Sequence, residues 1–319
     1  MNAVGLDLLL GPASLDRYIT QGVLLPGGGA LNMAYHWSQL GLPFHFLTRI
    51  GDDHAPLFLE FLDRHGIQYS PSIVAPGRSC SIDIVIEADL QPYMDNFVEG
   101  VWQGFRLDAD EQAMVAAADR LHVVLVDAAA AEVHRLGAEG VLDNVTVSGD
   151  FLSFRHYTVA RFAETMAHLQ LGIIGWPGAV DDPVLAGVRD VAFSQGKLVV
   201  VTLGSRGVQV FDGRNRSEQF VPVQAVEVRG TTVGCGDAFV AAFLAAWWRG
   251  ADVLTAVEAG KSAGAAAITT TSADGARSAI ALARSAVETT STKRTPAGAS
   301  VFRFAPTRVT SAPLSLIHI

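Results

Sequence analysis

Short apolar runs alternate with helical patterns along most of the chain. Four runs rich in valine and isoleucine each close at Asp or Gly and predict strands near residues 121–127, 144–150, 171–175 and 198–204. Between such runs lie amphipathic stretches. In residues 55–65 the leucines and phenylalanines share one face, and Gly66 follows as the expected C-cap. This alternation is typical of a parallel sheet covered by helices.

Two regions break the alternation, because they show strand patterns without a helix. They read GPASLDRYITQGVLLPGGG near the start and RSCSIDIVIEADLQPYMDNFVEGVW further on. We predict that residues 12–26 and 79–105, approximately, form a small second sheet that acts as a lid; an elaborated surface hairpin is the simpler alternative. The alternation in CSIDIVIE would leave an exposed strand edge in a monomer, so the lid can also pair two copies into a homodimer.

Composition limits the classes of partner. The 319 residues carry a net charge of −9 with scattered basic residues, so we expect neither a nucleic-acid nor a membrane surface. The most apolar run, residues 238–248, is shorter than the roughly 20 residues that span a bilayer. No basic residue precedes Arg17, and the two cysteines, Cys80 and Cys235, lie far apart. These features predict a cytoplasmic protein in a reducing compartment.

One domain accounts for residues 1–288. After Glu288 the chain is rich in Thr, Ser, Pro and Ala without periodicity, so we expect residues 289–319 to form a loosely ordered tail. Its last residues, PLSLIHI, match no earlier pattern and are interpreted as partly foreign to the native chain.

The stretch TTVGCGDAF places a lone acid, Asp237, behind two glycines and ahead of a long apolar run. Gly234 and Gly236 allow backbone N–H groups to converge, and the helix that starts near Asp237 adds the positive end of its dipole. Together they predict a pocket for an anion beside a carboxylate that can accept a proton. A purely structural interpretation is that Asp237 only complements the helix dipole, an effect of about 0.3–1 kcal/mol.

Two further stretches carry weaker signals. PGGGALNMAYHWSQLG combines three glycines, as a hinge or a close approach to a ligand, with a helix over residues 30–40 whose first turn holds Asn32. A flexible turn with an exposed Asn is the alternative. VVVTLGSRGVQVF predicts a strand, a turn and a second strand, with Thr202 and Gly204 at the carboxyl end of the first strand, where open α/β sheets bind ligands.

Together the three stretches resemble the ribokinase-like (PfkB) carbohydrate kinase family, over roughly residues 6–280. GGGALNMA is similar to the N-terminal signature of that family, and GCGDAF is similar to its C-terminal signature. The resemblance implies a catalytic base at Asp237 and an anion hole at Gly234, Cys235 and Gly236. It also implies substrate contacts from Asp16, Gly27, Gly28 and Asn32, and nucleotide contacts from Thr202, Gly204 and Gly207.

The resemblance further implies a three-layer α/β/α fold with a mostly parallel sheet and a small β-sheet lid. The implied activity is ATP-dependent phosphorylation of a hydroxyl group on a small-molecule sugar, sugar derivative or nucleoside, with Mg²⁺ delivered by ATP. Asp237 would take the proton of the substrate hydroxyl, and the anion hole would stabilise charge on the transferred phosphoryl group. Which sugar or nucleoside is bound does not follow from the residues.

The chain departs from the family pattern on the metal side. Thr231 and Thr232 stand where the family usually has Asp-Thr, which weakens the basis for a monovalent-cation site. The family's Asn-x-x-Glu, which helps to place magnesium, is replaced by GWPGAVDD, where Asp181 and Asp182 are interpreted as surface acids. A catalytically degenerate regulatory protein that binds a sugar or nucleotide is therefore the alternative function. A dinucleotide-dependent oxidoreductase is disfavoured, because PGGGALNM lacks the spacing Gly-x-Gly-x-x-Gly.

Overall fold

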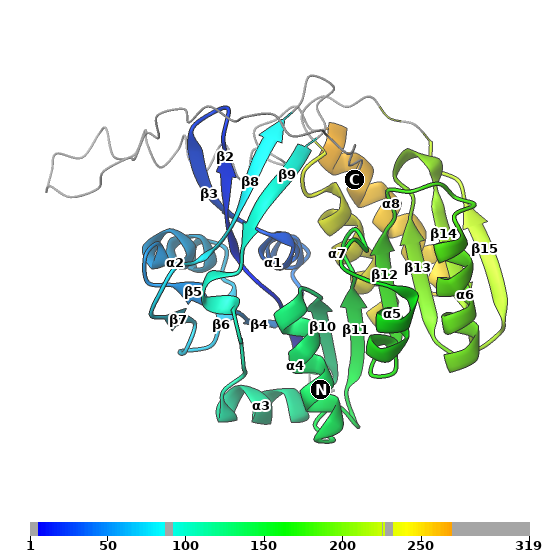
Figure 1. The fold of residues 1–319 in the computed structure, drawn as a ribbon, viewed down its shortest axis with the longest axis horizontal. Coiled ribbons are helices and arrows are strands. Elements are labelled where there is room, and N and C mark those ends of the chain that lie inside the picture. Colours follow the sequence, from blue (N-terminus) through cyan, green and yellow to red (C-terminus); the bar gives the residue numbers. More distant parts are fainter. Residues whose placement is uncertain (1–5, 87–91, 225, 227–231, 270–319) are drawn as a thin grey trace, which may run out of the picture.

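A nine-stranded sheet forms the centre of the molecule, of which the computed structural model describes residues 6–86, 92–224, 226 and 232–269 (Figure 1). The strand order is β15–β14–β13–β12–β11–β10–β1–β4–β6. Neighbouring strands from β13 across to β6 run parallel, whereas β14 and β15 are antiparallel. The bounds are β1 (Asp7–Leu10), β4 (His45–Leu47), β6 (Gln68–Tyr69), β10 (Arg120–Val124), β11 (Thr146–Asp150), β12 (Leu171–Gly175), β13 (Leu198–Thr202), β14 (Val208–Asp212) and β15 (Ser217–Val221).

Helices cover both faces of this sheet. On β1, Leu8 and Leu10 belong to the core that α4, α5 and α6 bury, whereas Leu9 belongs to the core that α1, α2 and α7 bury. This arrangement confirms the three-layer α/β/α fold with a mostly parallel sheet. The helices are α1 (Gly29–Gln39), α2 (Ala55–Arg64), α3 (Ala109–Ala116), α4 (Asp127–Ala138), α5 (Val159–Met166), α6 (Pro183–Gln195), α7 (Cys235–Trp248) and α8 (Val253–Thr269).

A separate four-stranded sheet stands at the carboxyl ends of the central strands (Figure 1). Its order is β3–β2–β8–β9, with β2 (Ser14–Tyr18), β3 (Val23–Gly27), β8 (Cys80–Ile86) and β9 (Pro92–Val98). These strands lie within the two segments that the sequence predicted for the lid, except that β3 extends one residue further, to Gly27. β9 is an edge strand on which Phe97 and Val98 are exposed, and a dimer through this sheet stays a prediction.

The predicted helices begin and end close to the expected residues. The helix expected over residues 30–40 is α1, and the helix expected over residues 55–65 is α2. The apolar helix α7 packs against α1 and α8, and the Trp37 indole of α1 donates to the Ala241 carbonyl of α7 at 3.1 Å. Within the part of the chain that the structure describes, no helix is both long and apolar enough to cross a membrane. The tail predicted at residues 289–319 lies outside that part.

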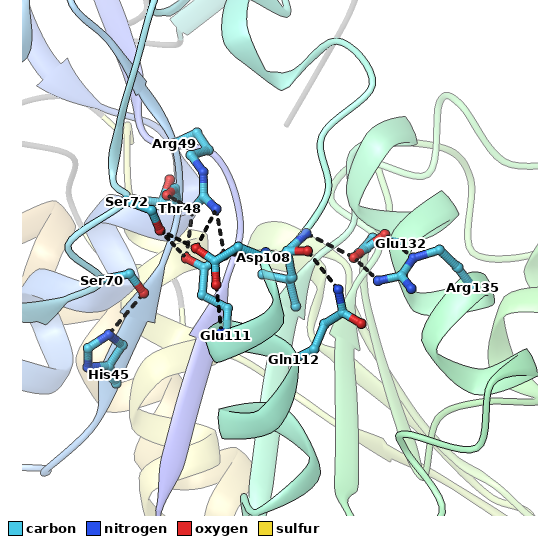
Figure 2. A network of polar contacts seen from close by, with 11 residues as sticks. His45, Thr48, Arg49, Ser70, Ser72, Asp108, Glu111, Gln112, Glu132 and Arg135 are labelled. Atoms are coloured by element: carbon cyan, nitrogen blue, oxygen red, sulfur yellow. Dashed lines mark hydrogen bonds and ion pairs between the residues drawn. The ribbon is translucent and has the colours of Figure 1, made fainter.

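A buried ion pair ties α3 to the segment that follows β4. The Arg49 guanidinium donates to the Glu111 carboxylate through two hydrogen bonds of 2.7 and 2.5 Å, and Asp108 lies 3.8 Å away (Figure 2). Arg49 is 8% exposed and Glu111 is 2% exposed. Asp108 and Glu111 also form a capping box at the start of α3. The buried Glu111 carboxylate therefore neutralises the Arg49 guanidinium and also helps to cap the N-terminus of α3.

The variant Glu111→Gln keeps the shape of the side chain but leaves the Arg49 guanidinium buried with only Asp108 nearby. Breaking a buried pair in this way typically costs about 3–5 kcal/mol, so we expect the free energy of unfolding to fall by that order. Chemical denaturation measures the loss. Glu60→Gln is the control, because the Arg64–Glu60 pair lies on the surface. Equal losses in the two variants would show that the buried pair adds no special stability.

Candidate active site

The first turns of α1 and α7 meet although they lie far apart in the sequence. Asn32 Nδ2 donates to Asp237 Oδ2 at 2.7 Å across a separation of 205 residues. Asn32 is itself fixed, because its backbone amide donates to the Gly28 carbonyl at 2.9 Å. Gly29 lies beside the pair, and a Cβ there would stand 3.3 Å from Asp237 Oδ1. The two glycine stretches therefore build one site around the Asp237 carboxylate.

The loop at the start of α7 leaves room for a ligand beside Asp237. Gly234 caps the helix with φ 78°, and no atom lies within 4 Å of where a Cβ on the exposed Gly236 would be. The first turn of a helix presents backbone amides that have no intrahelical acceptor, near the positive end of the dipole. Burial raises the pKa of the Cys235 thiol to about 11, so no thiolate repels an anion here. The loop can hold a phosphoryl group.

Asp16 reaches the same region from β2 of the small sheet. It is 5% exposed, and its carboxylate accepts from Ser14 Oγ at 2.8 Å and from the backbone amide of Gly28. A Cβ on Gly27 would overlap this carboxylate, and a Cβ on Gly28, which has φ 91°, would lie 2.7 Å from Ser14 Oγ. The two glycines therefore allow the chain to pass close to β2 and place Asp16 next to α1.

Sequence reasoning missed a third acid, Asp150, at the end of β11. It is 6% exposed, and its Oδ1 accepts from the backbone amide of Leu152 at 2.8 Å. Leu152 has φ 53°, which is unusual for a leucine, and its side chain lies 3.8 Å from the position of a Cβ on Gly29. The sequence pattern that could have identified Asp150 is an apolar strand that ends at an acid. That pattern places a carboxylate at the ligand-binding edge of a parallel sheet.

The surroundings of Asp16, Asp150 and Asp237 disfavour the charged form of each carboxyl group. Burial raises the pKa of Asp16 to about 7, the Ser14 hydrogen bond opposes the rise, and the charge of Asp237 adds to it. Burial also raises the pKa of Asp150 to about 7, and the charge of Asp237 contributes there as well. The pKa of Asp237 rises to about 6 through burial, and its hydrogen bond from Asn32 limits the rise. Perturbed carboxyl groups gathered in this way are typical of functional sites.

The predicted nucleotide residues lie beyond β11 and β12, at the end of β13. Thr202 ends that strand and its hydroxyl donates to the Ile174 carbonyl at 3.3 Å, while the space around Gly204 is open. Gly207 is packed against protein atoms instead, because a Cβ there would lie 2.6 Å from the Phe220 ring. The position of Thr231 lies outside the described residues. The structure thus gathers Asp16, Gly27, Gly28, Asn32 and the Gly-Cys-Gly-Asp loop, with Thr202 and Gly204 along the same sheet edge.

Comparison with known proteins agrees with this geometry. Residues 175–279, which include α7 and its glycine loop, match the profile described as pfkB family carbohydrate kinase. This region of the chain is therefore similar to the PfkB carbohydrate kinases. Fructoselysine 6-kinase of Escherichia coli (strain K12) is 25% identical to it over 261 residues, which are 81% of this chain and 95% of the relative. Cytidine kinase of Thermococcus kodakarensis is 28% identical over 264 residues, 77% of this chain and 90% of the relative.

A solved structure shares the fold of this chain. Ribokinase of Arabidopsis thaliana, complexed with ribose and ATP, superimposes with a TM-score of 0.67 at 19% identity. The match covers 84% of this chain and 94% of the ribokinase chain. The sheet, the covering helices and the small second sheet therefore form a ribokinase-like fold.

Asp150→Asn tests whether the buried carboxyl groups of this site destabilise the protein without ligands. The pKa of Asp150 is about 7 in the fold, against an ordinary value of 3.8. Such a group contributes stability below its unfolded pKa, and that stability is lost as the pH rises through its folded pKa. Asparagine does not ionise, so the variant does not lose stability in this way as the pH rises. We expect the variant to gain unfolding free energy over wild type from about pH 4 to about pH 7.

Denaturation of both proteins at the two ends of that pH range measures the difference. A further measurement near about pH 3, below the unfolded pKa, serves as the internal control, because Asp150 is mainly protonated there in both the folded and the unfolded wild type. A difference that does not grow with pH would mean that burial of Asp150 carries no electrostatic cost.

Proposed function

We propose that the protein transfers the γ-phosphoryl group of ATP to a hydroxyl group of a sugar, a sugar derivative or a nucleoside. The observation that carries this proposal is a partly buried carboxylate, Asp237, at the start of a helix that can bind an anion. A proton acceptor beside a phosphate cradle is what phosphoryl transfer to a hydroxyl group requires. The fructoselysine and cytidine kinases among the relatives support both substrate classes.

Asp237 acts as the general base in this proposal. The substrate hydroxyl oxygen attacks the γ-phosphorus of ATP, its proton passes to Asp237, and the bond from the γ-phosphorus to the bridging oxygen breaks to release ADP. Because Asn32 donates to Oδ2, Oδ1 is the oxygen left to receive the proton. The amides at the start of α7 stabilise the charge that develops on the phosphoryl oxygens.

The other site residues bind and orient the two substrates. Asp16 accepts hydrogen bonds from substrate hydroxyl groups, and Gly27 and Gly28 keep the backbone close to them. Thr202 and Gly204 lie on the side of the sheet edge where the nucleotide is proposed to bind. Within the described residues no group of three or more His, Cys, Asp or Glu side chains is arranged to hold a metal. Mg²⁺ is proposed to arrive with ATP, since such ions use one or two carboxylates together with phosphate oxygens.

A regulatory protein that binds the same ligands without turnover is the second candidate. The loop after β12 favours it, because this loop lacks the metal-placing pattern of the family. Its Asp182 is already used as the N-cap of α6, where it accepts the amide of Val184 at 2.9 Å. A screen of the purified protein with ATP and Mg²⁺ against sugars, amino-sugar conjugates and nucleosides, read by ADP release, separates the candidates. Binding without turnover on any compound would favour the regulatory protein.

Asp237→Asn keeps the shape and the hydrogen bond to Asn32 but removes the proton acceptor. General-base catalysis typically contributes about 10²- to 10⁴-fold, so we expect kcat to fall by at least that order while ATP and the acceptor still bind. Asp127→Asn is a matched control, because Asp127 is an exposed acid in the first turn of α4. If the Asp237 variant lost thermal stability but kept full turnover, the residue would be a helix-dipole acid and not the base.

Gly27→Ala tests the placement of the lid acid. The added methyl group would overlap the Asp16 carboxylate, which must then turn away from the site. A displacement of this size can lower the rate about 100-fold, and we expect kcat/KM for the acceptor to fall by about 10- to 100-fold. The KM for ATP should change little. Gly22→Asn, in the turn of the same hairpin, is the control, because open space surrounds its Cβ position and asparagine tolerates the left-handed φ of 62° there better than other residues do. Unchanged acceptor kinetics in Gly27→Ala would remove Asp16 from the substrate site.

A further inference from the structure

Residues 48–51, which we call the anchor segment, lie where the chain crosses between the two sheets. The segment follows β4, which pairs with β1 in the central sheet. Beyond this pairing the Gly11 amide still donates to the Leu47 carbonyl at 3.3 Å, but Pro12 has no amide hydrogen to extend the pattern. β2 of the small sheet then begins at Ser14. The chain therefore leaves one sheet for the other right beside the anchor segment.

The Thr48 side chain supplies the hydrogen bond that the backbone pattern lacks at this point. Its Oγ1 accepts from the Ala13 amide at 3.2 Å, although the two residues are 35 positions apart. Thr48 is 0% exposed and Ala13 is 1% exposed, so the bond lies away from solvent. Asp16 follows Ala13 on β2. The Thr48 hydroxyl oxygen therefore fixes the start of the strand that carries Asp16.

The anchor segment also holds two other points at which the chain enters or leaves the small sheet. The Gly51 amide donates to Ser79 Oγ at 3.0 Å, directly before β8. The Trp102 indole donates to the Arg49 carbonyl at 3.0 Å, in the 3₁₀ turn that follows β9. The start of β2, the start of β8 and the end of β9 are therefore all bonded to one short segment of the central domain.

A buried charge holds the anchor segment itself in place. The Arg49 guanidinium donates to the Thr48 carbonyl at 2.9 Å as well as to Glu111 of α3 (Figure 2). The Ile50 amide donates to the Ile73 carbonyl at 2.9 Å, and Ile50 is 0% exposed. Because the segment is bound to α3 and packed into the core, it can support the small sheet rigidly.

We propose that Thr48 is a positioning residue for the acceptor, because its bond to the start of β2 sets where Asp16 stands relative to the central sheet. The catalytic consequence rests on the proposed function. The bonds from Ser14 and from the Gly28 amide orient the Asp16 carboxylate locally, whereas the Thr48 bond ties the strand itself to the chain after β4. Thr48 acts through Asp16 and contacts neither substrate, since it is fully buried.

Thr48→Val tests this anchor, because valine keeps the branched shape and removes the oxygen that accepts the Ala13 amide. Hydrogen–deuterium exchange of the protein without ligands is followed by mass spectrometry over β2, with β13 as the internal reference. A buried amide without an acceptor favours local opening, so we expect exchange in β2 to become about tenfold faster while β13 changes much less. Thr48→Ser keeps the oxygen and should exchange as wild type does.

The kinetic measurement uses the acceptor that gives the highest turnover in the ADP-release screen. In Thr48→Val we expect kcat/KM for this acceptor to fall by about 10- to 100-fold through displacement of Asp16, with little change in the KM for ATP. Thr48→Ser should recover most of the loss. Thr165→Val is the matched control, because Thr165 is also 0% exposed and its hydroxyl donates to the Arg161 carbonyl on α5 at 3.1 Å. This control should leave both kinetic constants unchanged.

Equal exchange of β2 in wild type and Thr48→Val would overturn the proposal, and so would a rise that is as large in β13 as in β2. A KM for ATP that rises together with the acceptor KM would also overturn it, since the effect would not be confined to the acceptor side. If wild type turned over no compound, the proposed function would fail, and the exchange of β2 would still decide whether Thr48 anchors this strand.

Discussion

The hydrogen bond from Asn32 to Asp237 is the contact on which the site depends. It joins the first turns of two helices that come from opposite ends of the domain, and it selects which carboxylate oxygen faces the ligand. Packing behind it makes this geometry rigid, because α7 is apolar along its length and Trp37 of α1 donates to the α7 backbone. The glycines around it have a steric role: they let α1, β2 and the start of α7 approach one another without side chains between them.

The electrostatics of the site follow from the same close packing. Asp16, Asp150 and Asp237 converge at the carboxyl edge of the sheet, and burial raises the pKa of each. Such an arrangement is unfavourable in the protein without ligands and becomes favourable when a cation, a proton or hydroxyl donors enter. A fold stabilised elsewhere can tolerate this, and the two hydrophobic cores on either side of the sheet supply that stability.

Local patterns in the sequence predicted the parts of the structure that local chemistry determines. The α/β alternation, the helix around Asn32 and the glycine loop before Asp237 were all visible, and the family resemblance assigned their order in the site. Asp150 was not found, because its importance depends on which strand lies beside which, and strand order is a property of the whole sheet. Gly207 shows the opposite case. A glycine in a turn can serve a ligand or a neighbouring ring, and only the structure shows Phe220 packed against it.

The most direct measurement is the pH dependence of kcat/KM for the acceptor with saturating ATP and Mg²⁺, since this ratio reports the ionisation of groups in the enzyme before the acceptor binds. The account predicts an acidic limb, on which the rate rises with pH as the Asp237 carboxyl loses its proton near pH 6. Because Asp237 interacts with Asp16 and Asp150, the observed value belongs to the coupled group. A rate that is constant from about pH 5 to about pH 8 would contradict the assignment of Asp237 as a partly buried general base.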